Sequence, residues 1–136
     1  MNHQEHQEHQ AISAEADTVG RAIVDAGLKV HRALGPGLLE SAYEHCLAHE
    51  LSARGVAVRR QVPLPIIFDG IQIEAGYRLD LLVDDLVIVE VKAVDTLAPL
   101  NEAQLLTYLK LSGLRLGYLM NFNVKLLKQG LRRLAL

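Results

Sequence analysis

The order of hydrophobic and polar positions predicts that the chain begins with two helices. Hydrophobic residues recur every three or four positions over 13–34 and again over 38–54, which is the spacing of one buried helix face. The sequence Gly-Pro-Gly at 35–37 separates the two segments and Gly55 follows the second, because glycine tolerates a positive φ and proline cannot continue a helix. The residues of the second helix that we expect to face the core are Leu39, Ala42, Tyr43, Cys46, Leu47 and Leu51.

After Gly55 the hydrophobic period changes to two, which indicates strands. Residues 56–67 are predicted to form a strand, and the two prolines within it are typical of a sheet edge or a bulge. Asp69-Gly70 is a hairpin-turn signal that allows 71–74 to pair back. A second, strongly apolar hairpin is predicted over 77–92.

In the last third of the chain, the hydrophobic pattern predicts a helix at 97–112, a buried strand at 114–121 and a final strand or short helix within 124–136. A strand, a helix and a strand between residues 87 and 120 imply a right-handed crossover, so those two strands should be parallel. The expected fold is therefore an α/β domain with a mixed sheet flanked by helices. This single domain is expected to span 13–136, after a polar, disordered tail at 1–12 that contains His3, His6 and His9.

Charged residues interrupt the apolar pattern in the hairpin at 77–92. Glu90 and Lys92 share one face of a strand, and Asp80 lies on the strand before it. One interpretation makes Asp80 and Glu90 ligands of a hard divalent cation such as Mg²⁺, with Lys92 beside a water or a phosphate. The other makes Glu90 and Lys92 an ion pair and Asp80 the cap of a turn.

The length of the connection between the two strands tests these interpretations. With a two-residue turn at Asp84-Asp85, Asp80 would fall opposite Val89, and Glu90 would lie on the other face. A three-residue connection that includes Leu86 places Asp80 opposite Glu90. Two facing carboxylates repel each other and a bound cation would relieve that repulsion, so we predict the three-residue connection or an equivalent bulge.

Composition and charge narrow the class of protein. The 136 residues suit one domain, the single cysteine excludes an internal disulfide, and no apolar run approaches the roughly eighteen residues of a membrane span. A cytoplasmic protein without membrane association is expected. The net charge is −2, but residues 1–92 hold 8 Lys/Arg against 14 Asp/Glu, and residues 93–136 hold 6 against 2. The basic residues that could form an anion-binding surface are Arg115, Lys125, Lys128, Arg132 and Arg133.

Several short motifs together resemble a known family. Residues 37–43 (GLLESAY) match the signature that names the GxxExxY family, and Asp80 with Glu90-Val91-Lys92 is similar to the D...ExK core of the PD-(D/E)xK nuclease superfamily. The resemblance spans about residues 16–134 and includes QLLTYLK at 104–110. It implies a restriction-endonuclease-like core.

The resemblance also implies roles for individual residues. Asp80 and Glu90 match the metal-binding acids, and Lys92 matches the lysine that assists attack of water on a phosphodiester. Glu40 matches a helical acid that completes the metal shell in nuclease relatives. Gln104 and Tyr108 resemble the QxxxY element of exonucleases, which contacts substrate or orients the acids.

Three other residues are interpreted mainly as structural and not as part of the active site. Tyr43 is expected to pack in the core with its hydroxyl paired, although substrate contact or support of Glu40 are alternatives. His31 is interpreted as a structural histidine with satisfied hydrogen bonds, and Cys46 as a small hydrophobic residue.

The function implied is hydrolysis of nucleic acid, DNA rather than RNA, by a Mg²⁺- or Mn²⁺-dependent phosphodiesterase without a covalent intermediate. A homodimer that spans a duplex is a further expectation, because the domain is small and has an exposed edge strand. The alternatives are a binding module that keeps the nuclease fold without cleavage and an enzyme that acts on a small phosphate compound.

Overall fold

The computed structural model describes residues 12–136. Its helices are α2 (Ala14–Leu34), α3 (Glu40–Ala53), α4 (Pro99–Ser112) and the short 3₁₀ helix η1 (Leu127–Gln129). Its strands are β1 (Val58–Pro63), β2 (Ile66–Phe68), β3 (Ile71–Ile73), β4 (Arg78–Val83), β5 (Val87–Lys92), β6 (Leu116–Asn121) and β7 (Leu131–Ala135).

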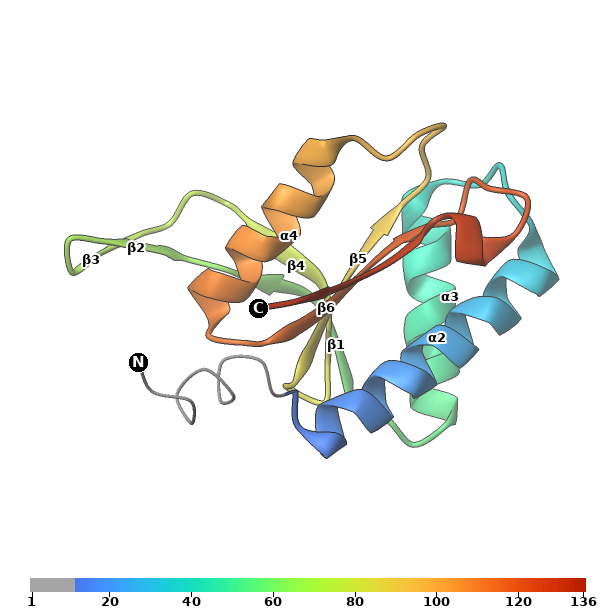
Figure 1. Cartoon of the computed structure of the whole chain (residues 1–136), viewed down its shortest axis with the longest axis horizontal. Helices are drawn as coiled ribbons and strands as arrows, with labels where there is room; N and C mark the ends of the chain where they lie inside the picture. Colours follow the sequence, from blue (N-terminus) through green and yellow to red (C-terminus); the bar gives the residue numbers. More distant parts are fainter. Residues whose placement is uncertain (1–11) are drawn as a thin grey trace, which may run out of the picture.

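The main sheet has five strands in the order β1-β4-β5-β6-β7, and helices cover both faces. In Figure 1, α4 lies on one side of this sheet and α2 with α3 on the other. Strands β5 and β6 are parallel, as the crossover through α4 predicts, and the other neighbouring pairs are antiparallel. The predicted α/β class, with a mixed sheet flanked by helices, is confirmed.

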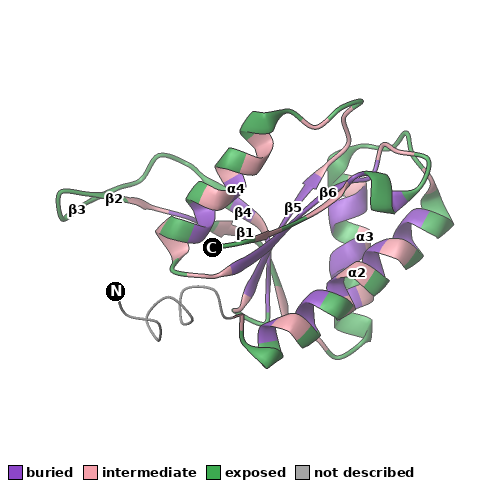
Figure 2. Cartoon of the chain, viewed as in Figure 1, coloured by how far each residue is buried: buried purple, intermediate pink, exposed green. Residues whose placement is uncertain are grey.

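Alternate residues of β5 face the two helical layers. Val87, Val89 and Val91 belong to the hydrophobic cluster under α2 and α3, whereas Ile88 belongs to the cluster under α4. Because both faces are covered, the central strands are buried along most of their length (Figure 2). Within the described part of the chain, no helix is long and apolar enough to cross a membrane.

The segment at 56–67 forms two strands instead of the single one predicted. Strand β1 ends at Pro63, and β2 pairs only with β3 in a separate two-stranded sheet that projects from the body (Figure 1). The prolines at 63 and 65 lack the amides that would extend the ladder, whereas Leu64 N donates to Tyr77 O at 2.8 Å. The predicted turn is confirmed: Asp69 and Gly70 have φ of 52° and 74° and connect β2 to β3.

Leu39 does not face the core as expected. It is 77% exposed because it is the extended residue before α3, and the helix begins at Glu40. The C-terminal segment at 124–136 contains both elements that were considered for it, the short helix η1 and the strand β7.

The predicted polar tail lies almost entirely outside the described residues. Residues 1–11, including His3, His6 and His9, are not part of the described structure. Ile12 is described, and it is partly buried against the cluster under α2 and α3.

Candidate active site

The connection between β4 and β5 has the predicted length. Asp84 and Asp85 both have φ of 54°, and Leu86 N donates to Val83 O at 3.0 Å, which closes a tight turn. Val83 nevertheless pairs with Val87, so Leu86 is an extra residue in the connection. The three-residue connection is confirmed.

The same register brings the two acids together. Leu81 pairs with Val89, so the next position along the ladder places Asp80 opposite Glu90. Here the side chains replace the backbone carbonyls: Asp80 N donates to Glu90 Oε2 at 2.9 Å, and Val91 N donates to Asp80 Oδ2 at 2.8 Å. Each acid therefore accepts a hydrogen bond from a backbone amide of the other strand. At this position these two bonds take the place of backbone-to-backbone pairing between β4 and β5.

Burial raises the pKa of both acids, and neighbouring carboxylates raise it further. Glu90 is 5% exposed, and burial followed by the charge of Asp80 raises its pKa to about 8. Burial is also the main cause that raises the pKa of Asp80, and the charges of Glu44 and Glu40 add to it. The charge of Lys92 acts in the opposite direction on both acids. Ionising both acids is therefore costly in the structure as it stands.

Lys92 is the last residue of β5, where it is half-buried. In the part of the chain that the structure describes, no ion pair within 4 Å joins it to Glu90, so the interpretation of these residues as an ion pair is not supported. Lys92 is paired with Asn121 of β6, which fixes its backbone at the end of the sheet.

Glu40 reaches the same end of the sheet from α3. It is the first residue of that helix, it is exposed, and its Oε2 accepts a hydrogen bond of 3.2 Å from Ala93 N, directly after β5. The loop before α3 is held by Tyr43, whose hydroxyl donates to Gly35 O and accepts from Leu38 N. The structure therefore brings Glu40 close to the strand that carries Glu90 and Lys92.

Two polar residues near Asp80 were not identified from the sequence. Glu44 on α3 is 5% exposed, and its carboxylate accepts hydrogen bonds from Arg60 at 2.7 Å and Gln61 at 2.8 Å. The amide of Gln61 also lies 3.5 Å from Asp80 Oδ1. Gln61 has φ of 54°, a left-handed conformation that is unfavourable for a residue with a side chain.

Two signals in the sequence could have identified this pair. Glu44 follows Glu40 by four residues, so both lie on one face of α3. Gln61 lies between two β1 residues that pair with Leu81 and Leu79, which places it opposite Asp80. This second signal depends on the pairing of β1 with β4, which only the fold reveals.

Tyr108 lies close to the acids, whereas Gln104 does not bind them. Burial and then the charge of Glu90 raise the pKa of Tyr108, which is 6% exposed on α4. Gln104 and Tyr108 line one pocket of about 300 Å³, in which the rings of Tyr77 and Tyr108 meet edge to face at 6.2 Å. Among the described contacts, Gln104 makes no hydrogen bond to Asp80 or Glu90.

Tyr43 and His31 have the structural roles that the sequence predicts. Tyr43 is fully buried and stacks on Phe122 with ring centroids 4.6 Å apart. His31 is 7% exposed, and its Nε2 lies 2.8 Å from Val124 O. Cys46 is a partly buried free cysteine that packs against the same cluster.

The donors at this site fit a hard divalent cation. Asp80 Oδ1 and Glu90 Oε1 are carboxylate oxygens that accept no hydrogen bond from the backbone of residues 12–136, and carboxylate oxygens are preferred ligands of Mg²⁺. Within residues 12–136, no three His, Cys, Asp or Glu side chains are grouped closely enough to hold a metal ion. The structure thus brings together two acids, Asp80 and Glu90. The carboxylate of Glu40 accepts a hydrogen bond from the Ala93 amide and does not join them.

Comparison with known proteins agrees with this geometry. Neither a curated protein nor a solved structure gives a significant match to the chain. The family model described as the PD-(D/E)XK nuclease superfamily matches residues 17–134, which include both acids, Lys92 and all of the main sheet apart from the last residue of β7. The chain therefore belongs to the PD-(D/E)XK nuclease superfamily.

Proposed function

We propose that the chain is a divalent-metal-dependent nuclease of the GxxExxY type. The observation that carries this proposal is the pairing of Asp80 with Glu90, two acids of raised pKa on neighbouring strands with Lys92 in electrostatic reach. Two such acids are destabilised when ionised unless a cation joins them. Asp80 and Glu90 would hold Mg²⁺ or Mn²⁺, with Glu40 as a third carboxylate from α3.

The residues around the acids suit hydrolysis of a phosphodiester. When bound, the ion would lower the pKa of a water and neutralise charge on the phosphate. Lys92 places a positive charge beside that phosphate and can orient the attacking water. Gln104 and Tyr108 line one pocket, and the charge of Glu90 acts on Tyr108, so these two residues would contact the substrate. Nucleic acid, DNA rather than RNA, is the substrate in this proposal.

A second candidate is a binding module that keeps the fold without cleavage. The observation in its favour is that Glu40 is bonded to the Ala93 amide and forms no three-carboxylate group with the two acids. An enzyme that acts on a small phosphate compound is the third candidate, because the same acids and lysine would serve it.

Cleavage assays with matched variants separate these candidates. Labelled single-stranded DNA, duplex DNA, RNA and a small phosphodiester are incubated with Mg²⁺ or Mn²⁺. We expect DNA cleavage that falls at least 100-fold in Asp80→Asn and in Lys92→Ala. The control Asp84→Asn makes the same substitution at the exposed turn of the hairpin and should stay within twofold. Equal cleavage in parent and variants would exclude this mechanism, and binding without cleavage would favour the module.

Metal binding has a readout that does not depend on activity. The midpoint of thermal unfolding above pH 8 should rise with Mg²⁺ in the parent, because the ion binds the folded state only. The double variant Asp80→Asn/Glu90→Gln should show no rise. A rise of equal size in both proteins would place the ion elsewhere.

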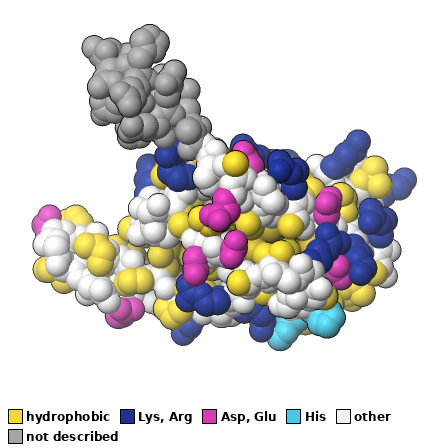
Figure 3. All heavy atoms as spheres, turned by 90° about the horizontal axis from the view of Figure 1, so that it is seen from below, with side chains coloured by type: hydrophobic (Ala, Val, Ile, Leu, Met, Phe, Trp, Pro, Cys, Tyr) yellow, Lys and Arg dark blue, Asp and Glu magenta, His cyan; other side chains and the backbone are white. Residues whose placement is uncertain are grey.

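A homodimer and a cytoplasmic location stay predictions. The exposed apolar residues of the β2–β3 hairpin are the surface that we propose for a second copy, namely Ile67, Phe68, Ile71 and Ile73. Figure 3 shows hydrophobic side chains along this projecting arm. The hairpin pairs with no strand of the main sheet, so its apolar side chains lie on an exposed arm that a second copy would cover. Light scattering should give a dimer for the parent and a monomer for Ile71→Lys.

A further inference from the structure

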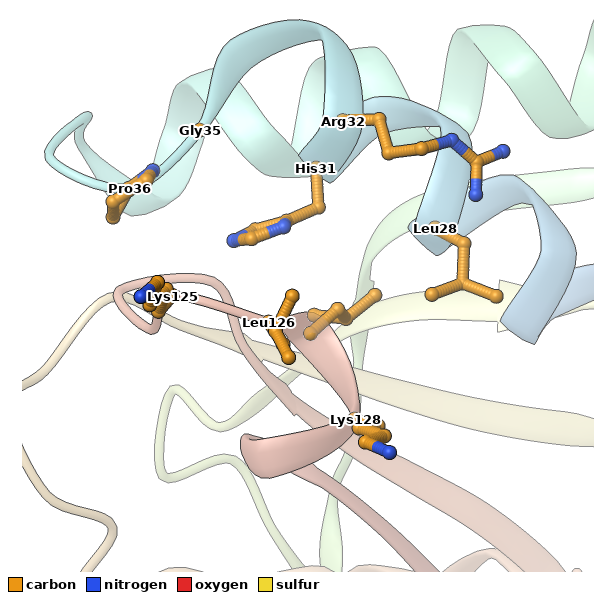
Figure 4. Close-up of a pocket in the computed structure, with 9 residues that line it drawn as sticks. Leu28, His31, Arg32, Gly35, Pro36, Lys125, Leu126 and Lys128 are labelled. Atoms are coloured by element: carbon orange, nitrogen blue, oxygen red, sulfur yellow. The ribbon is translucent and has the colours of Figure 1, made fainter.

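A basic pocket of about 500 Å³ lies between the C-terminal end of α2 and the segment that contains η1. Arg32 lines it from the helix, and Lys125 and Lys128 line it from the opposite segment (Figure 4). The lining contains no Asp or Glu. Figure 3 shows Lys and Arg side chains gathered at this end of the molecule, opposite the β2–β3 hairpin.

The three basic side chains of this pocket have no acidic partner among the described residues. In the described part of the chain, neither Arg32, Lys125 nor Lys128 forms an ion pair within 4 Å. Five other basic residues do form such pairs: Lys29, Arg54, Arg59, Arg60 and Arg133. Three unpaired cations around one recess in a chain of net charge −2 favour an anionic ligand.

The back wall of the pocket is ordered by buried contacts. His31 points from α2 toward the opposite segment in Figure 4 and binds Val124 O at 2.8 Å. Its ring lies 6.2 Å from that of Phe122, which also stacks on Tyr43. The two walls that carry the cations are therefore held together before any ligand binds.

Short chain segments connect this pocket to the acids. Gly35 lines the pocket, and Glu40 follows it by five residues. On the other wall, Lys125 follows Asn121 by four residues, and Asn121 is paired with Lys92.

The arrangement of the cations indicates a polymer backbone instead of one small anion. In Figure 4, Arg32 lies on the helix side, Lys125 lies below Pro36, and Lys128 lies on the far side of the recess. They do not converge on one point, as they would around a single phosphate. Leu28 and Leu126 give the recess an apolar floor that suits a sugar or a base edge.

We propose that this pocket binds the sugar-phosphate backbone of a nucleic-acid strand at nucleotides away from the scissile bond. The inference rests on the proposed function for its choice of ligand. It adds a second contact region, formed by Arg32, Lys125 and Lys128, that holds the strand whether or not cleavage occurs.

Binding measured without metal tests this site separately from catalysis. Fluorescence anisotropy with labelled single-stranded and duplex DNA is recorded in EDTA, so that no strand is cut. We expect Arg32→Ala, Lys125→Ala and Lys128→Ala each to weaken binding about threefold to tenfold. Each should also reduce the slope of log K against log salt by about one, because one phosphate contact is lost.

Arg21→Ala is the matched control. Arg21 is exposed on the same helix as Arg32, and eleven residues of helix place it roughly 16 Å away. Its replacement changes the net charge equally and should leave affinity within twofold. Equal weakening by Arg21→Ala and Arg32→Ala would show a general charge effect and overturn the proposal.

Two further results distinguish this proposal from its alternatives. If the pocket variants bind DNA like the parent while Asp80→Asn loses cleavage, the nuclease stands and the pocket does not bind the strand. If the pocket variants lose affinity while the parent never cleaves, the pocket stands and the nuclease does not.

Inorganic phosphate is titrated in parallel by NMR. Chemical-shift changes at Lys125 and Lys128, without an effect of the variants on DNA binding, would make this a small-anion site and overturn the proposal.

Discussion

The backbone amide of Asp80 donates to Oε2 of Glu90 at 2.9 Å, so one acid of the candidate site holds the strand that carries the other. In the other direction, Val91 N donates to Asp80 Oδ2. The two carboxylates thus fill the position where backbone pairing of β4 and β5 would continue. A change in the charge of either acid should therefore also affect how the two strands are joined.

The pKa of Glu90 predicts a pH dependence of stability. Its pKa is about 8 in the folded protein against an ordinary value of 4.5, so folding favours the protonated form. This contribution to the free energy of unfolding is fully present below pH 4.5 and is lost as the pH rises through 8. Each pKa unit corresponds to about 1.4 kcal/mol. Urea unfolding between pH 4 and 9 in EDTA measures it.

Glu90→Gln should flatten this profile, because the amide cannot ionise. The control Glu74→Gln replaces an exposed glutamate and should retain the profile of the parent. A parent whose stability rises between pH 5 and 8 would contradict the assigned sign.

Tyr43→Phe should show whether the Tyr43 hydroxyl positions Glu40, because the variant leaves the packing of the core unchanged. The variant keeps the ring that stacks on Phe122 but removes the hydroxyl that binds Gly35 O and Leu38 N. Loss of these hydrogen bonds should cost about 1–3 kcal/mol in urea unfolding. Cleavage at saturating Mg²⁺ should fall further than in Tyr118→Phe, which loses a hydroxyl that lies against Gly20 of α2 instead. Equal activity in the two variants would show that the loop before Glu40 needs no support from Tyr43.

Substitutions at Gln61 should distinguish backbone strain from contact with the acids. Gln61→Gly removes the side chain that links Glu44 to Asp80 but relieves the unfavourable φ of 54°. Gln61→Ala removes the same functional group but keeps a Cβ, so the unfavourable left-handed conformation remains. We expect glycine to be more stable than alanine by about 1 kcal/mol in urea unfolding, with equal loss of cleavage in both. A glycine variant with full activity would show that the amide does not position Asp80.

Gly130→Ala should be strongly destabilising. A Cβ at this position would overlap the backbone oxygen of Asn121, which cannot move aside without disturbing the end of β6. Gly117→Ala is the comparison, because its nearest neighbour is the flexible side-chain end of Leu105 at 3.0 Å. Thermal unfolding should show a loss above about 3 kcal/mol for Gly130→Ala and a smaller one for Gly117→Ala. Similar losses would contradict the steric explanation.

The motif residues and the register between them could be predicted from the sequence. The alternation of β5 places Glu90 and Lys92 on one face, and the strand-helix-strand order makes β5 and β6 parallel. These features depend on local periodicity, turn chemistry and handedness, which a linear sequence contains. The three-residue connection was predicted because a cation bound between two facing acids would relieve their repulsion, and the register confirms its length.

Other parts of the site depend on contacts between residues that are distant in the chain. Gln61 reaches Asp80 only because β1 lies beside β4, and Arg60 neutralises Glu44 only because α3 packs near that edge. The basic pocket exists because Lys125 and Arg32, far apart in the sequence, line the same recess.

The sequence by itself thus determined most helices and strands, the two acids and their register, because each follows from spacing within a short segment. The tertiary structure decided which residues surround the acids and which cations meet in the basic pocket. The physical reason is that strand order and helix packing set the distances between remote side chains, and no local pattern encodes those distances. Leu39 illustrates the boundary: its spacing suited a buried helix face, but its position before the first turn of α3 left it exposed.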